Sequence, residues 1–184
     1  MAPDPFMLNL DDLLRDLPPQ RRDEILAAIL PLRRYAMLME QAVAVSQAAF
    51  NGDAVEKVAH LLLNGASRVG HYQAGAFVVV TPLGPVVAAA FGDFAGSDGR
   101  PAPIALVPRQ VTRLAPEELQ DVSVALGIPP PAHELYVVPV ASATTQVGAL
   151  VLLDANGESA DDRLMESYAS RAAMAYLHAA QQPR

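Results

Sequence analysis

The chain has 184 residues, a formal net charge of −7 at pH 7 and no cysteine. This length suits one domain of ordinary size with an extension, and it is sufficient to bury a sizeable hydrophobic core. The absence of cysteine excludes disulfides, thiolate metal sites, thiol nucleophiles and thioether-linked chromophores. The negative charge disfavours nucleic acid and anionic lipid, so we expect neither as a partner.

The chain is expected to consist of an N-terminal helical extension, residues 1–35, and a main domain, residues 36–184. Its start lacks the charged and apolar regions of a secretion signal, and no apolar run approaches the roughly 20 residues that cross a bilayer. We therefore expect a cytoplasmic protein with no membrane partner. In the extension, a leucine stripe predicts a short helix from Asn9 to Leu17.

The helical pattern continues from Pro19 to Phe50 but contains Pro31. Because proline lacks a backbone N–H group, we expect two helices here, over 19–30 and 32–50. The second helix is apolar on two sides, so two different surfaces should cover it. One of its faces consists of Ala36, Met39, Val43, Ser46 and Phe50.

The middle of the chain changes from helical to strand patterns. Asp53 and Glu56 have the spacing of a capping pair and predict a helix that ends at Gly70. Residues 74–91 are typical of a β-hairpin around "PLGP". An irregular region, 92–134, follows, with a weak strand at 104–107 and a short helix at 116–126. Binding residues often lie in such regions.

A second hairpin, "ELYVVPVAS" and "TQVGALVLL", precedes the closing helix. Its strands are apolar on both faces, so we expect the sheet to be covered on both sides. Ser159 and Asp162 have the spacing of a capping pair, which predicts that the closing helix starts at Ser159. Small residues along this helix allow a neighbouring helix to approach closely.

The V-P-V of the second hairpin, its G-A-L-V-L strand and the closing "SRAAMAYLHA" resemble a GAF domain. The resemblance covers about residues 36–181. It implies an α+β fold in which an antiparallel sheet of about five to six strands is flanked by helices. PAS and roadblock domains have a related outline, and "AGAFVVVTPLGPVVAAAFGD" also suits the opening hairpin of a roadblock domain.

GAF domains are sensory, regulatory and dimerisation modules, and some hold cyclic nucleotides, bilins, haem or small metabolites beneath the irregular region. If such a pocket exists here, we expect Phe91, Phe94, Arg109, His133 and Tyr136 to line it. The N-K-x-x-D-E type motif of cyclic-nucleotide-binding members is missing. Without cysteine the chain can neither attach a bilin covalently nor act as a free methionine sulfoxide reductase.

No motif for catalysis is complete in the sequence. His133-Glu134 begins like the metalloprotease H-E-x-x-H, but no second histidine follows. The glycines of "GDFAGSDG" fit neither the dinucleotide-binding nor the P-loop spacing, and "GASRVG" misses that of a nucleophile elbow. We therefore expect no enzyme, no cofactor and no metal.

The first and last helices of GAF-like proteins commonly pack side by side, and two copies then form a helical bundle. The resemblance implies the same here, whereas the alternative is that residues 9–30 of the same chain cover the second apolar face. Our hypothesis is a non-enzymatic signalling module that acts as a homodimer or as an adaptor for a protein partner. The alternative function is a small-molecule sensor. The expected association surface consists of Met39, Val43, Ser46, Phe50, Ala172, Ala175, Tyr176 and Ala179.

Overall fold

The computed structural model describes residues 14–70, 72–131, 133–153 and 161–182. The chain divides into two compact units, Met1–Ala36 and Met37–Arg184. Most of the short helix expected over residues 9–17 lies outside the described residues. None of the described helices combines the length and the apolar character that a membrane crossing requires.

Helix α2 is continuous from Pro19 to Phe50 and contains Pro31. The expected division into two helices is therefore wrong. Proline in a helix interior costs about 3 kcal/mol relative to alanine, because it removes one hydrogen bond and crowds the carbonyl group four residues earlier. Alanine, leucine and arginine surround Pro31 and are strong helix formers, so the loss of one bond does not end the helix.

Within the described residues, five strands form one antiparallel sheet in the order β2-β1-β5-β4-β3. The α+β class and both expected hairpins are confirmed. Pro82 and Leu83 form the tight turn of the first hairpin, and Gly84 adopts a φ of 121° there, which suits glycine and few other residues. The strands are β1, Gly75–Thr81; β2, Gly84–Phe91; β3, Thr112–Leu114; β4, Leu135–Ala141; and β5, Gln146–Leu153.

The irregular region differs from its expected structure in two places. The 3-10 helix η2, Ile104–Leu106, replaces the expected strand, and the strand β3 pairs with β4 although the sequence did not indicate it. Prolines lie close to Ile104 on its N-terminal side, and each lacks the donor that a sheet ladder needs. The expected helix is confirmed as the 3-10 helix η3, Pro116–Glu118, followed by α4, Gln120–Leu126.

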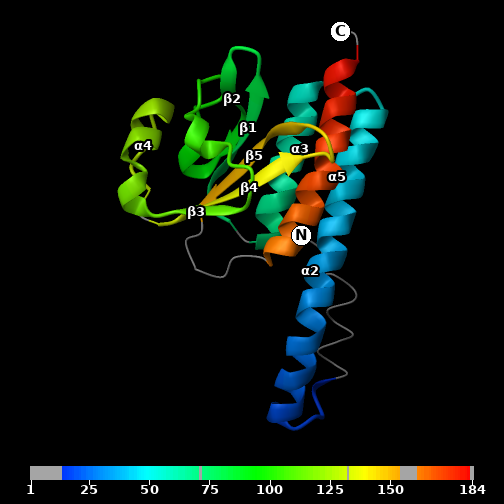
Figure 1. The fold of residues 1–184 in the computed structure, drawn as a ribbon. Coiled ribbons are helices and arrows are strands. Elements are labelled where there is room, and N and C mark those ends of the chain that lie inside the picture. The colour runs from blue at the N-terminus through cyan, green and yellow to red at the C-terminus, as the bar shows by residue number, and fades with distance from the viewer. Residues whose placement is uncertain (1–13, 71, 132, 154–160, 183–184) are drawn as a thin grey trace. The chain divides into compact units, whose positions relative to one another are not determined.

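The sheet is buried on both faces, as its apolar strands predict. Leu150 and Leu152 of β5 belong to one hydrophobic cluster, whereas Val151 and Leu153 belong to another. This alternation follows from strand geometry, because successive side chains point to opposite faces. A helical layer covers the first face. The irregular region, with the 3-10 helix η1, Gly92–Phe94, and with α4, covers the second (Figure 1). The helical layer consists of α3, Val55–Gly70; α5, Asp162–Gln181; and residues 37–50 of α2.

Helix α5 begins at Asp162, and Asp161 is its N-cap. The carboxylate of Asp161 accepts a hydrogen bond of 2.9 Å from the backbone N–H of Arg163. The expected capping pair of Ser159 with Asp162 is therefore wrong, and Ser159 itself lies outside the described residues. Serine and aspartate are both good N-caps, so the sequence did not distinguish the two positions.

Helices α3 and α5 approach each other closely at Gly65. Tyr168 of α5 is fully buried, and its hydroxyl group donates a hydrogen bond of 2.7 Å to the carbonyl oxygen of Leu62 in α3. A Cβ atom at residue 65 would overlap this hydroxyl group and press against Gln41 of α2. Glycine is therefore required where the three helices meet.

We expect Gly65→Ala to lower the free energy of unfolding by about 1–2 kcal/mol, because overpacking outweighs the roughly 1 kcal/mol that alanine gains in a helix. Urea denaturation measures this difference. In a Tyr168→Phe background the same substitution should be less harmful, because the hydroxyl group that meets the new methyl group is gone. Equal losses in the two backgrounds would contradict the close approach.

Candidate functional site

An open groove runs between the C-terminal part of α2 and α5 in the second unit. Three large apolar side chains on it, Val43, Phe50 and Met174, are 54%, 71% and 61% exposed. Exposed apolar side chains that gather in one place mark interaction sites more often than scattered ones do. The residues that line the groove are Met39, Ala42, Val43, Ser46, Gln47, Phe50, Asn51, Arg171 and Met174.

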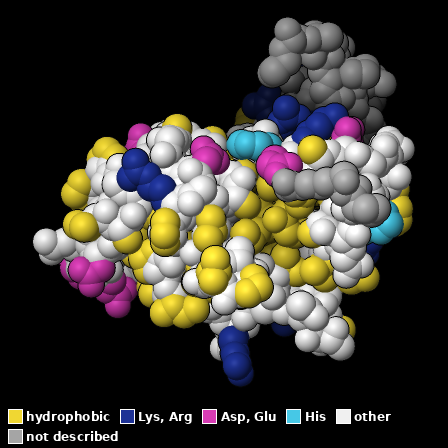
Figure 2. Space-filling model, turned by 90° about the horizontal axis from the view of Figure 1, so that it is seen from above, with side chains coloured by type: hydrophobic (Ala, Val, Ile, Leu, Met, Phe, Trp, Pro, Cys, Tyr) yellow, Lys and Arg dark blue, Asp and Glu magenta, His cyan; other side chains and the backbone are white. Residues whose placement is uncertain are grey.

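Exposed apolar side chains also occur elsewhere on the second unit. Figure 2 shows hydrophobic side chains over the middle of the face that is turned to the viewer. Val80, Leu83, Ile104 and Val124 are exposed as well, and none of them lines the groove. The exposure of apolar side chains alone therefore does not distinguish the groove from the rest of the surface. The groove is distinguished by apolar side chains that lie on two neighbouring helices around one concave surface.

The groove follows from the spacing of residues on the two helices. Positions 39, 43, 46 and 50 are separated by four, three and four residues, so they share one face of α2. The buried residues of this part of α2, such as Leu38 and Val45, lie on a different face and belong to the core. On α5, Arg171 and Met174 are three residues apart and both are exposed. Each helix therefore uses one face for the core and leaves another for the groove.

The structure divides the expected association surface into two groups. Met39, Val43, Ser46 and Phe50 line the groove. The α5 group does not, because its small residues let α5 pack inside its own chain. Three of them are buried in the core, and Tyr176 is half-buried, with its ring edge-on to that of Phe77 at 5.1 Å. The buried residues are Ala172, Ala175 and Ala179.

On the α5 side the groove is lined by Arg171 and Met174, which were not among the residues expected from the sequence. The sequence does indicate an outward position for Met174, because this residue lies on a different face of α5 from the alanines that pack into the core.

Phe50, which lines the groove, also contacts the last turn of α5. Its ring stacks on that of His178, with centroids 4.6 Å apart and planes tilted by 41°. The side-chain nitrogen of Gln182 lies 3.2 Å from Nε2 of His178 and donates a hydrogen bond of 3.1 Å to the carbonyl oxygen of Ala49. These contacts tie the end of α5 to the end of α2.

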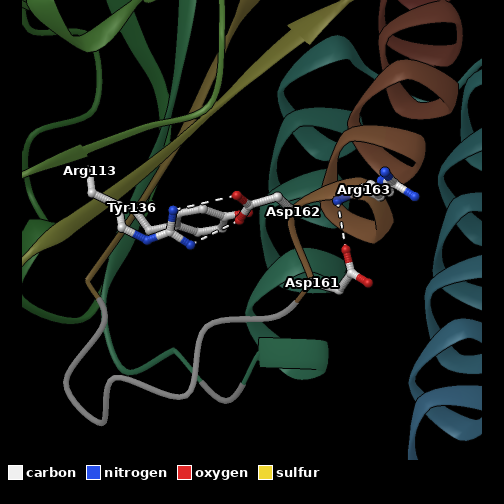
Figure 3. Close-up of polar contacts among 5 residues, drawn as sticks. All are labelled: Arg113, Tyr136, Asp161, Asp162 and Arg163. Atoms are coloured by element: carbon white, nitrogen blue, oxygen red, sulfur yellow. Dashed lines mark hydrogen bonds and ion pairs between the residues drawn. The ribbon is translucent and has the colours of Figure 1, made fainter.

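A polar cluster of Arg113, Tyr136 and Asp162 joins the sheet to the start of α5 (Figure 3). Nη2 of Arg113 lies 2.9 Å from Oδ1 of Asp162, and the hydroxyl group of Tyr136 donates to the same oxygen at 3.0 Å. The Arg113 guanidinium also lies over the Tyr136 ring, 4.8 Å from its centroid. Arg113 and Tyr136 are opposite each other on β3 and β4, so the sheet register brings them together.

The members of this cluster shift each other's ionisation. The hydrogen bond from Arg113 lowers the pKa of the Asp162 carboxyl group, and the same bond raises the pKa of Arg113. Burial raises the pKa of Tyr136, and the hydrogen bond to Asp162 adds to the effect. At neutral pH the cluster is therefore an ion pair with a neutral phenol. This state anchors the first turn of α5 to the sheet.

The five residues expected to line a ligand pocket do not surround one space. Phe94 is buried in the cluster on one face of the sheet and Tyr136 in the cluster on the other. Phe91 is half-buried, while Arg109 and His133 are exposed. In the described part of the chain, no group of three or more histidine, aspartate or glutamate side chains is arranged to hold a metal ion.

Comparison with known proteins shows the fold. No family model matches the sequence, and no curated protein matches it. Among solved structures, the GAF domain from Acinetobacter phosphoenolpyruvate-protein phosphotransferase is similar, with a TM-score of 0.59 and 12% sequence identity over 80% of this chain and 97% of that chain. The chain has a GAF-like fold. The resemblance stated from the sequence is thereby confirmed at the level of the fold.

A second GAF domain, from Pseudomonas syringae pv. tomato, is 16% identical, with a TM-score of 0.48 over 85% of this chain and 90% of that chain.

In the GAF-like fold of this protein, the groove lies on the helical layer and the polar cluster lies where that layer meets the sheet. Both features involve α5.

We expect Asp162→Asn to lower the free energy of unfolding at pH 7 by about 1 kcal/mol or less, because solvent screens a partly exposed ion pair. The pKa of Asp162 is lowered in the folded protein. Its stabilising contribution is therefore present above the unfolded-state value of about 3.9 and is lost as the pH falls below it.

Urea denaturation at pH 7 and at about pH 3 measures the effect. The difference between wild type and Asp162→Asn should shrink at the lower pH, whereas the control Asp98→Asn, at an exposed loop position, should match wild type at pH 7. A difference that stays the same at both pH values would show that the ion pair does not stabilise the fold.

Proposed function

We propose that this chain is a non-enzymatic GAF-like regulatory module that acts by protein association, and that two copies dock through the groove between α2 and α5. The proposal rests on one observation: Val43, Phe50 and Met174 are exposed around a single groove. The regulatory role rests on the GAF-like fold, since GAF domains as a family are sensory, regulatory and dimerisation modules. We place the protein in the cytoplasm, as the sequence suggests.

The energetic argument concerns these exposed side chains. Burying a large apolar side chain completely contributes about 1.5–3 kcal/mol. In a two-fold symmetric pair both copies contribute the same surface, so each groove residue is buried once in each copy. This gain opposes the loss of translational and rotational freedom, which costs roughly 4–15 kcal/mol. The free energy from burying apolar side chains of both copies is therefore set against a single loss of translational and rotational freedom.

The composition of the groove also suits an interface. Among the described residues that line the groove, Arg171 is the one charged residue, although the chain carries 20 aspartates and glutamates. The centres of protein interfaces are depleted in charged residues, and arginine is the charged type that is enriched there. Ser46 is small and only half-buried, so a helix of the second copy can approach α2 closely at this position. Gln47 and Asn51 are exposed and polar, as is usual for the rim of an interface.

Light scattering of the full chain over a range of concentrations tests the proposal. We expect a dimer for wild type and a monomer for Met174→Glu and for Val43→Glu, because each substitution would bury a carboxylate in the docked pair. Both positions are exposed in the single chain, so the melting temperatures should change little. Val124→Glu is the matched control, because Val124 is 78% exposed but lies on α4.

Two results would contradict the proposal. One is a wild-type chain that stays monomeric at every concentration, which would leave the groove for a different protein. The other is a dimer that Met174→Glu and Val43→Glu leave intact, which would place the dimer interface elsewhere.

A further inference from the structure

We propose that the α2 helices of two copies pair in parallel as a two-stranded coiled coil, along a seam that runs from Ile25 to Phe50. The inference rests on the proposed function, because the second half of the seam is the α2 side of the groove. It goes further in two ways. It adds the helical extension to the interface, and it fixes the direction in which the two copies meet.

The seam follows from the spacing of residues on α2. From Met39 to Phe50, the groove residues that share one helix face are separated by steps of four, three and four. The same alternation continues toward the N-terminus without a break as far as Ile25, within one continuous helix. An average step of about 3.5 residues is the heptad repeat, whose a and d positions face a partner helix. The a positions are Ile29, Ala36, Val43 and Phe50, and the d positions are Ile25, Leu32, Met39 and Ser46.

The length of this repeat favours a pair of supercoiled helices. A strict repeat of about 3.5 residues drifts around a straight α-helix by roughly 20° per heptad, unless two helices wind around each other. From Ile25 to Phe50 the repeat lasts for more than three heptads, and repeats sustained over about three to four heptads indicate a coiled coil. Among the described residues, none of α2 before Leu38 belongs to either hydrophobic cluster. Packing on the core therefore does not account for the repeat in the extension.

A second apolar stripe on α2 does not reach the groove. It consists of Leu26, Leu30 and Met37, which are 39%, 49% and 39% exposed and lie beside the seam. Continued along the helix, this stripe meets Glu40 and Gln47, which are polar and exposed. Of the two stripes, the seam is therefore the one that joins the extension to the groove.

The side chains of the seam suit two strands. Leu32, Val43 and Phe50 are 69%, 54% and 71% exposed, so the seam has apolar surface to bury in the extension and in the main domain. Near its centre, Ile29 and Val43 occupy a positions and Leu32 occupies a d position between them. β-Branched residues at a with leucine at d favour parallel coiled coils of two strands. Pro31 occupies neither an a nor a d position, so it lies away from the seam.

A parallel pair in register brings groove to groove and also covers the extension. Each seam residue then meets the same residue of the second copy. An antiparallel pair centred on the groove would leave Leu32 and the rest of the extension uncovered. An antiparallel pair that kept the whole seam would place the groove of one copy against the extension of the other. Parallel pairing is therefore the arrangement that agrees with docking of groove on groove.

The charges beside the seam are compatible with parallel pairing. In such a pair the e positions of one helix face the g positions of the other, and charges at these positions attract or repel. The charged e positions are Arg33 and Glu40, and they face Ala28 and Tyr35 of the second copy. Among the described residues that flank the seam, no like charges therefore face each other.

Leu32→Glu tests whether the extension belongs to the interface. Sedimentation of the full chain gives the dissociation constant of the dimer. The substitution places one carboxylate from each copy in the seam, so this constant should rise by about tenfold or more. Leu30→Glu is the matched control, because it adds the same charge two residues away and outside the seam, and its constant should stay within about threefold of wild type. Leucine and glutamate have similar helix propensities, so circular dichroism should show α2 unchanged in both variants.

Two results would overturn the inference and leave the proposed function intact. One is a Leu32→Glu dimer as stable as wild type, while Val43→Glu abolishes the dimer. The other is equal weakening by Leu32→Glu and Leu30→Glu, which would be an effect of added charge and not of the seam. A wild-type chain that is monomeric at every concentration would overturn the proposed function and this inference together.

The direction of pairing is tested by disulfide formation, because the chain has no cysteine of its own. In a parallel pair two copies of Leu32→Cys meet in one layer of the seam, within the reach of a disulfide, so they should oxidise to covalent dimers much faster than Leu30→Cys. In an equal mixture of Leu32→Cys and Val43→Cys chains, each variant should bond to itself. The two positions are separated by about 16 Å along a parallel pair, because a helix rises about 1.5 Å per residue.

Mixed disulfides between Leu32→Cys and Val43→Cys chains would show antiparallel pairing and overturn the inference. Oxidation of Leu32→Cys that is no faster than that of Leu30→Cys would overturn it as well.

Discussion

The central strands β1, β5 and β4 are apolar on both faces, and most of the structure follows from the need to cover both. The helical layer covers one face of the sheet. The segment from Phe94 to Ile128, which has little regular structure, covers the other. Because α5 and residues 37–50 of α2 each turn one face toward the core, their opposite faces form part of the surface of the helical layer. The groove between α2 and α5 is thus a consequence of how the core is closed.

Close packing in the helical layer explains why the small residues along α5 did not indicate which of its faces is exposed. An alanine-rich helix face indicates that something approaches closely, but it does not say whether that neighbour belongs to the same chain. Here Ala172, Ala175 and Ala179 pack within their own core, in the same hydrophobic cluster as Tyr168. The exposed Met174, on the other side of α5, is the better indicator of an outer surface.

Periodicity predicted the hairpins, α3 and α5, because each has a regular apolar pattern and a polar boundary. Sequence patterns failed at positions where the preference of one residue competes with that of its neighbours. Pro31 lies inside a helix because its neighbours are strong helix formers, and Asp161 rather than Ser159 caps α5. The pair of Arg113 and Asp162 joins residues 49 positions apart, so no local pattern reports it. A ligand pocket was expected from the family resemblance and from the irregular region 92–134, and Phe94 and Tyr136 lie in hydrophobic clusters on opposite faces of the sheet.

We propose that the groove between α2 and α5 receives a second copy of the chain. Since the chain has no cysteine, one engineered cysteine is a unique site for a short thiol-reactive cross-linker. Gln47→Cys places it in the groove lining, and Gln120→Cys places it at an equally exposed position on α4. We expect Gln47→Cys to yield covalent dimers much faster than Gln120→Cys. Equal rates, or faster cross-linking at residue 120, would contradict it.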